Sequence, residues 1–289
     1  MADLRASLAC PPVPRLHEGP PHRSNGRRSA CSPVPRPPAY LPAPPTAGLP
    51  VLRALLVDPA IDAVTVLARR PLPQWLKLPS TGKQTHPKLT TVADFNFRDY
   101  SPELRSSIGV HDACIWALGT TTRGVSDATY TEITVGYLEA FLDALKSAQV
   151  GSRQNPFRIV FVSGNGADPT ETSGVLFARV KGIAENRLLE ASIMSDRAIK
   201  PIIMRPAHFA PAPADAVHQR STAARYSDIF LGTTLGLLYP RGTISTHDLA
   251  QFAVGGVKGL WDAREDSVFE SWEMKKLVRE NAKANKAHS

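Results

Sequence analysis

The sequence has little cysteine and no long apolar run. Its 289 residues include three cysteines, Cys10, Cys31 and Cys114, whose spacing fits neither a disulfide framework nor a metal site. The longest apolar run of the C-terminal half, residues 229–239, contains two glycines and two threonines and is too short to span a bilayer. We therefore expect a protein of a reducing compartment, placed in the cytoplasm, without a metal centre.

Acidic residues are scarce in the first 45 residues. This segment holds 12 of the 26 prolines and six arginines, but only two acids, and it shows no apolar periodicity. The composition predicts a disordered extension. A mitochondrial presequence is the alternative, although such dense proline opposes the amphipathic helix that a presequence needs.

The net charge of +8 comes largely from the two ends of the chain. The last segment, residues 266–289, reads as a basic helix or tail. No zinc-finger, helix-turn-helix or RNA-recognition pattern accompanies the charge, so we expect no nucleic-acid partner.

Between these ends, apolar runs typical of strands alternate with helical patterns. Strands are predicted at 63–69, 89–93, 111–117, 157–163 and 201–205, and helices at 49–57, 128–148, 174–195 and 246–260. This alternation predicts an α/β fold, a Rossmann-like doubly wound parallel sheet over residues 46–265.

Ligands of doubly wound sheets bind where the strands end. Arg69 and Arg70 follow the first visible strand, and Gly48 lies 21 residues before Arg69, close to the spacing between a glycine turn and the residue that meets the adenosine ribose. Two arginines there suit the 2′-phosphate of NADP, whereas two ordinary surface arginines are the plainer interpretation. The other cofactor-binding candidates at strand ends are Asp94, Ala117, Leu118, Gly119 and Arg205.

The stretch RIVFVSGNGADPTETSGVLFARVKGIAEN carries the most information. Ser163 ends a buried strand, and Lys181 follows 18 residues later on a predicted helix. In this respect the chain resembles the short-chain dehydrogenase/reductase superfamily, where such a serine precedes a Tyr-x-x-x-Lys motif. The resemblance implies that Ser163 and Lys181 are catalytic and that Lys181 also binds the cofactor. A strand-end serine and an exposed helical lysine are the alternative.

The order of ALGTTTRG, VSGNGAD, VKGIAE and RPAHF is similar to an atypical subgroup, the Tat-interacting oxidoreductase-like proteins and their fungal mitochondrial outer-membrane relatives. The resemblance implies an NADP-dependent oxidoreductase that acts on a small-molecule carbonyl or alcohol. It also admits peripheral association with a membrane, at the mitochondrial outer surface.

One departure from that pattern concerns proton transfer. Phe177 occupies the tyrosine position of the motif, four residues before Lys181, and phenylalanine has no proton to give. The alternative function is therefore a catalytically impaired NADP-binding or regulatory protein. Other polar candidates in the same region are Tyr130, Asp168 and His208.

The second departure concerns the start of the fold. The family begins with a strand and a G-x-x-G-x-x-G turn, of which only Gly48 remains, because PAPP stands where the other glycines belong. Proline is disfavoured in central strands. We therefore expect a sheet without its first strand and of reduced stability, explained by an altered first exon, by a misjoined gene, or by a genuine isoform of low stability.

Overall fold

The computed structural model describes residues 39–42, 45–152, 154–209, 211–219, 221–222 and 241–287. Cys10, Cys31 and residues 223–240 lie outside these ranges. The described elements, in chain order, are β1 (Ala39–Pro42), α1 (Pro45–Val57), β2 (Val64–Leu67), β3 (Leu89–Val92), α2 (Pro102–Gly109), β4 (Ala113–Trp116), α3 (Asp127–Thr131), the π-helical turn η1 (Glu132–Gly136), α4 (Tyr137–Ser147), β5 (Phe157–Val162), α5 (Leu176–Met194), β6 (Ile199–Arg205), α6 (Pro213–Gln219), α8 (Thr246–Val257), β7 (Val268–Glu270) and α9 (Ser271–Ala287).

The strands form one parallel sheet in the order β3-β2-β1-β4-β5-β6-β7. Every residue of β4 and β5 is buried, as the apolar runs ACIW and FRIVFV predict for strands covered on both faces. The predicted α/β doubly wound fold is confirmed.

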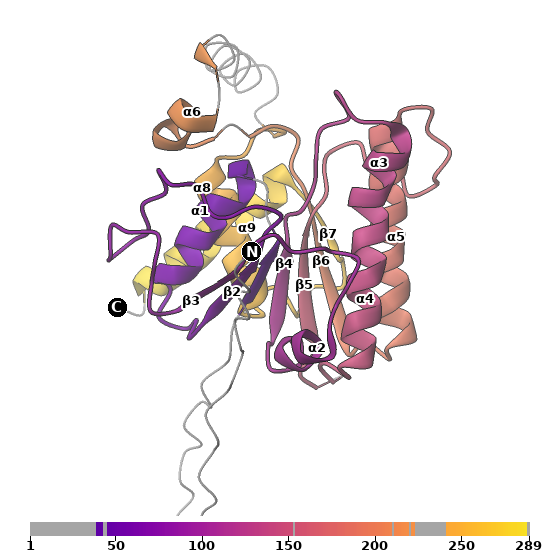
Figure 1. Cartoon of the computed structure of the whole chain (residues 1–289), viewed down its shortest axis with the longest axis horizontal. Coiled ribbons are helices and arrows are strands. Elements are labelled where there is room, and N and C mark those ends of the chain that lie inside the picture. Colours follow the sequence, from indigo (N-terminus) through magenta and orange to yellow (C-terminus); the bar gives the residue numbers. More distant parts are fainter. Residues whose placement is uncertain are drawn as a thin grey trace, which may run out of the picture. The chain divides into compact units, whose positions relative to one another are not determined.

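Helices cover both faces of this sheet (Figure 1). Helices α1, α8 and α9 pack on one face, and α4 and α5 pack on the other. The first layer buries leucines of α1 against α8, with Leu52, Leu55, Leu249 and Phe252 at most 1% exposed. The second layer packs Phe141 and Leu188 against the sheet. No helix in the described part of the chain combines the length and the apolarity needed to cross a bilayer.

The expectation of a sheet without its first strand is wrong. Strand β1 occupies the central position, where Ala39 pairs with Val64 of β2 and with Ala113 of β4, and Pro42 pairs with Leu67. The expected gap between β2 and β4 is therefore filled by AYLP, four residues from within the proline-rich stretch.

The expectation of a missing strand was wrong because a proline does not always exclude a strand. Proline disfavours the helical region for the residue before it and pushes that residue toward extended backbone, so Leu41 is biased toward a strand by Pro42. The N–H group that proline lacks matters little here, because the pairing of β1 with β4 ends at Tyr40 and Cys114, before Pro42. Pro42 is the last residue of the strand.

Helix α2, helix α6 and strand β7 were not predicted. Helix α2 begins after Ser101, whose hydroxyl accepts from the backbone N–H of Leu104, and Pro102 occupies its first turn. Serine followed by proline is a helix-start signal that the apolar periodicity does not contain. Strand β7 has only three residues, too few to show a period. The basic segment near the C-terminus forms the helix α9, which buries Met274 completely.

The central place of β1 can be tested by removing one N–H group. We expect Tyr40→Pro to lower the thermal midpoint by about 2–10 °C, because an unpaired buried backbone group costs about 1–3 kcal/mol in a domain of this size. Differential scanning calorimetry measures the change, with Tyr40→Val as the control that keeps the N–H group. Equal melting of the two variants would mean that β1 does not occupy the centre of the sheet.

Candidate functional site

The carboxyl ends of the seven parallel strands meet along one edge of the sheet. The chain proceeds outward from β1 to β2 and β3, and then returns to the opposite side of β1 at β4. The order therefore reverses between β1 and β4. In open α/β sheets this reversal opens the crevice in which dinucleotides bind.

The residues after β4 line this crevice with backbone. Ala117 and Leu118 are buried, at 3% and 4% exposure. A Cβ atom added to Gly119 would meet no heavy atom within 4 Å, so the backbone at Gly119 faces open space. The structure thus places these three candidates together, beside the end of β1.

The arginine pair lies one strand further out. Arg69 and Arg70 directly follow β2 and are both exposed. Asp94, in the loop after β3, is exposed and has a left-handed backbone with φ of 54°. The two loops are held together by Ala68, whose N–H donates to Val92 and whose carbonyl accepts from the N–H of Phe95. Both arginine side chains are thus available to an anion at this edge.

Helix α1 starts at the end of β1 next to the crevice. Its first residue is Pro45, which has no N–H to lose at a helix start, and Gly48 is buried in the same first turn. The first N–H groups of any helix lack intrahelical acceptors and favour a pyrophosphate. Residues 43–44, which connect β1 to this helix, lie outside the described residues.

Ser163 and Lys181 are brought together at the end of β5, but neither is widely open to a ligand. Both are 7% exposed. The ammonium group of Lys181 donates to the backbone carbonyl of Val162 at 3.0 Å and lies 5.0 Å from the ring centre of Phe161. Lys181 therefore braces the end of the strand that carries Ser163.

Phe177 lies against the same strand end. A Cβ atom added to Gly164 would come within 2.5 Å of the ring tip of Phe177, so the ring packs directly on the residue that follows Ser163. The side chain at the tyrosine position thus approaches the serine, but it brings carbon where the family pattern brings a hydroxyl. The described site lacks this proton donor.

A buried charge pair under Ser163 was not predicted. Glu185, which is 1% exposed, accepts from the hydroxyl of Ser163 at 2.5 Å. Arg205 donates to both carboxylate oxygens of Glu185, from Nε at 3.0 Å and from Nη2. The predicted cofactor residue Arg205 is thus engaged with Glu185. The sequence did contain a signal for this contact, because Glu185 follows Lys181 by four residues and therefore lies on the same helix face.

Burial also changes the proton affinity of Lys181. Desolvation lowers its pKa from the ordinary value of 10.5 to about 8, and the negative charge of Glu185 partly opposes this effect. An ammonium group removed from water is disfavoured relative to the neutral amine. Lys181 is therefore closer to deprotonation at physiological pH than an exposed lysine.

Helix α6 is tied to α1. Arg53 donates to both carboxylate oxygens of Asp215, at 2.6 and 2.8 Å. The ring of His218 stacks on Trp75 with centroids 4.6 Å apart. Thr46 lies within 3.4 Å of Gln219. These contacts join α6 to α1 and to the loop after β2, and none of them was predicted.

The remaining polar candidates have structural partners or are buried. Asp168 holds the loop after β5 by accepting from Thr170 and from the N–H of Ser173, and the hydrogen bond from Thr170 is the main reason its pKa is lowered. Burial raises the pKa of Tyr130, which is 1% exposed. The backbone of the half-buried His208 bridges to Thr243 just after β6, whereas its ring Nε2 has no hydrogen-bond partner among the described residues. The described residues contain no group of three or more potential metal ligands of the His, Cys, Asp and Glu types.

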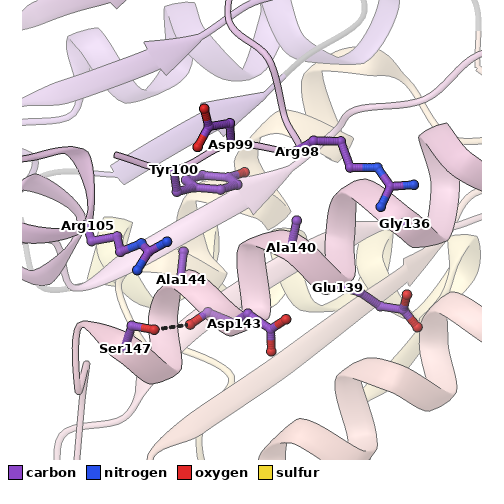
Figure 2. A pocket seen from close by; sticks show the side chains of 10 residues that line it. All are labelled: Arg98, Asp99, Tyr100, Arg105, Gly136, Glu139, Ala140, Asp143, Ala144 and Ser147. Atoms are coloured by element: carbon purple, nitrogen blue, oxygen red, sulfur yellow. Dashed lines mark hydrogen bonds between the residues drawn. The ribbon is translucent and has the colours of Figure 1, made fainter. Parts of the chain in front are cut away.

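A separate cavity of about 390 Å³ lies beside α2 and α4, away from the crevice (Figure 2). Arg98, Arg105 and Asp143 are among the side chains that line it. Arg98 is already paired with Glu132. Because the lining mixes both signs of charge, it favours neither an anion nor a cation.

Several solved structures are similar to this chain in fold. A short-chain dehydrogenase/reductase from Burkholderia thailandensis superposes with a TM-score of 0.60 over 89% of this chain and 99% of that one, at 14% identity. The enzyme WbmH of Bordetella bronchiseptica, in complex with NAD+, gives 0.52 over 88% and 83%, at 14% identity. A tyrosine-to-phenylalanine variant of ElxO with NADPH bound gives 0.53 over 83% and 95%, at 17% identity.

The chain thus shares a Rossmann-like fold with these solved structures. Sequence comparison adds less. No family model matches the sequence. The leucinostatins biosynthesis cluster protein T of Purpureocillium lilacinum is 26% identical over 139 residues, which is 48% of this chain and 46% of that protein. The chain thus spans about half the length of this curated relative.

The lowered pKa of Lys181 predicts a pH dependence of stability. Between pH of about 8 and about 10.5 the unfolded chain still binds the proton that the folded chain has lost, so the free energy of unfolding rises with pH. Relative to Lys181→Met, the wild type should gain up to about 3 kcal/mol over this window, as measured by urea unfolding.

The exposed Lys286 provides the matched control. Lys286→Met should leave the pH profile of the wild type unchanged. Parallel profiles for the wild type and Lys181→Met would show that the buried ammonium carries no such penalty.

Proposed function

We propose that the chain binds NADP(H) in the crevice between β1 and β4, and that its capacity to reduce a carbonyl is low. The contact of Phe177 with Gly164 carries this proposal, because it puts a ring without a proton at the position from which the family pattern donates one. A small-molecule ligand would lie beside the nicotinamide, on the side of α6.

The preference for NADP rests on the arginine pair. Arg69 and Arg70 follow β2, the strand next to β1 on the outward side. A guanidinium group can donate two parallel hydrogen bonds to a phosphate, and exposed positions leave both groups free to adjust to the 2′-phosphate. The neighbours include proteins with NAD+ and with NADPH bound, and the arginine pair favours the second cofactor for this chain.

The absence of the phenol does not oppose cofactor binding. The ElxO variant with a tyrosine-to-phenylalanine change was obtained with NADPH bound. A phenylalanine in this fold is thus compatible with an occupied cofactor site. Binding without turnover is the behaviour expected of a regulatory protein.

An active NADP-dependent oxidoreductase is the second candidate. The observation that favours it is Lys181, which remains next to Ser163 and whose pKa is lowered to about 8 by burial. A group that titrates near neutral pH can exchange a proton with a reacting oxygen. In that case the substrate is a carbonyl or alcohol, reduced or oxidised with another group in place of Phe177.

Cofactor preference can be measured directly. Replacement of both Arg69 and Arg70 by alanine should weaken NADPH binding about tenfold or more, and NADH binding much less, because only NADPH carries the 2′-phosphate. Fluorescence titration gives both dissociation constants. The control replaces Lys276 and Lys283, two exposed cations of α9, and should leave the ratio unchanged. Equal weakening of both cofactors would contradict the proposal.

Restoring the phenol tests the catalytic part of the proposal. Phe177→Tyr should raise NADPH-dependent turnover above that of the wild type, since a placed proton donor contributes on the order of 10²–10⁴ in rate. The assay follows NADPH oxidation with a panel of small carbonyl compounds. Phe177→Leu, which has no proton, should stay at the wild-type level. High wild-type activity that Phe177→Tyr does not change would favour the active oxidoreductase.

A further inference from the structure

We propose that Ser163 accepts a hydrogen bond from the ligand, and that Glu185 and Arg205 hold it in this role, so that the site favours an alcohol over a carbonyl compound. The inference rests on the proposed function, because it concerns the ligand that lies beside NADP(H).

The direction follows from what each atom can do. The hydroxyl of Ser163 lies 2.5 Å from Oε1 of Glu185. An ionised carboxylate can only accept, so the single proton of Ser163 is the one shared between them. Hydrogen bonds from a hydroxyl to a carboxylate are short and about twice as strong as neutral ones, which keeps the proton there.

Arg205 holds the carboxylate of Glu185 in place. Its Nε donates to Oε1 at 3.0 Å and its Nη2 donates to Oε2, a two-pronged contact in which Glu185 is 1% exposed. The side chain of Arg205 is itself only 16% exposed, so the pair is largely removed from water. Loss of one member of such a buried pair is strongly unfavourable. Both oxygens of Glu185 therefore serve as acceptors for protein donors.

Neighbouring groups do not restore a proton at this point. The ring of Phe177 has none to give. Asn165 donates its amide hydrogen to Glu270 at 3.1 Å, and Lys181 directs its ammonium at the carbonyl of Val162. Each of these two groups donates one hydrogen to a protein acceptor, and the single hydrogen of Ser163 is directed at Glu185, so the Ser163 oxygen itself offers a ligand only lone pairs.

Ser163 therefore distinguishes a ligand that carries a hydroxyl group from one that carries a carbonyl group. A ligand hydroxyl can donate to the oxygen of Ser163, whereas a carbonyl oxygen would face its lone pairs without a bridging proton. Glu185 and Arg205 touch no ligand in this scheme and act as positioning residues. The ligand class is thus a small alcohol.

A matched pair of probes, cyclohexanol and cyclohexanone, tests this selection. Binding of each is titrated by calorimetry on the chain alone and on the chain saturated with NADP+, while NADPH formation is followed optically. We expect cyclohexanol to bind about fivefold to tenfold more tightly, the effect of one net hydrogen bond. Ser163→Ala should reduce the ratio to about one, and Ser163→Thr, which keeps the hydroxyl, should retain most of it.

A double variant tests the positioning residues. Replacement of Glu185 and Arg205 together by leucine removes a buried ion pair without leaving a lone charge, a change that proteins often tolerate. It frees the proton of Ser163, so the preference should shift toward cyclohexanone. A purely structural role would leave the ratio unchanged. Thermal melting confirms that each variant is folded.

Three results would overturn the inference: equal or tighter binding of cyclohexanone to the wild type, a preference that survives Ser163→Ala, or no binding of cyclohexanol. The proposed function fails by a different result, the absence of NADP(H) binding. In that case, the preference for cyclohexanol over cyclohexanone, measured without cofactor, would still decide the role of Ser163.

Discussion

The central constraint of this structure is the parallel pairing of β1 with two neighbours at once. Strand β1, with the sequence AYLP, lies between β2 and β4. Ala39 and Tyr40 pair with residues of both neighbours, and the two residues that follow pair with β2. Without that strand the two halves of the sheet would not be joined by hydrogen bonds. The strand order reverses at β1, which is the position where dinucleotides bind in open α/β sheets.

The polar groups at the end of β5 are organised toward the protein interior. Lys181 donates to the strand that carries Ser163, and Ser163 donates to Glu185, which is held by Arg205. Each of these side chains thus has a partner within the protein.

Helix α6 is joined to α1 and to the loop after β2. Arg53 of α1 and Trp75 of the loop after β2 both contact this helix, through Asp215 and His218. Asp215 is only 2% exposed, so its pair with Arg53 is largely shielded from water. Loss of one member of such a shielded pair is strongly unfavourable.

By itself, the sequence determined the alternation of strands and helices, since apolar periodicity is a local property. It also placed Ser163 at the end of one strand, and Phe177 and Lys181 on the helix that follows it. It did not reveal β1, because the four residues AYLP are too few to show a periodicity. They form a strand because β2 and β4 offer backbone partners on both sides. Nor did it reveal the bond from Ser163 to Glu185, 22 residues away. Tertiary packing decided both, because backbone groups and buried charges must find partners that only the folded chain brings within reach.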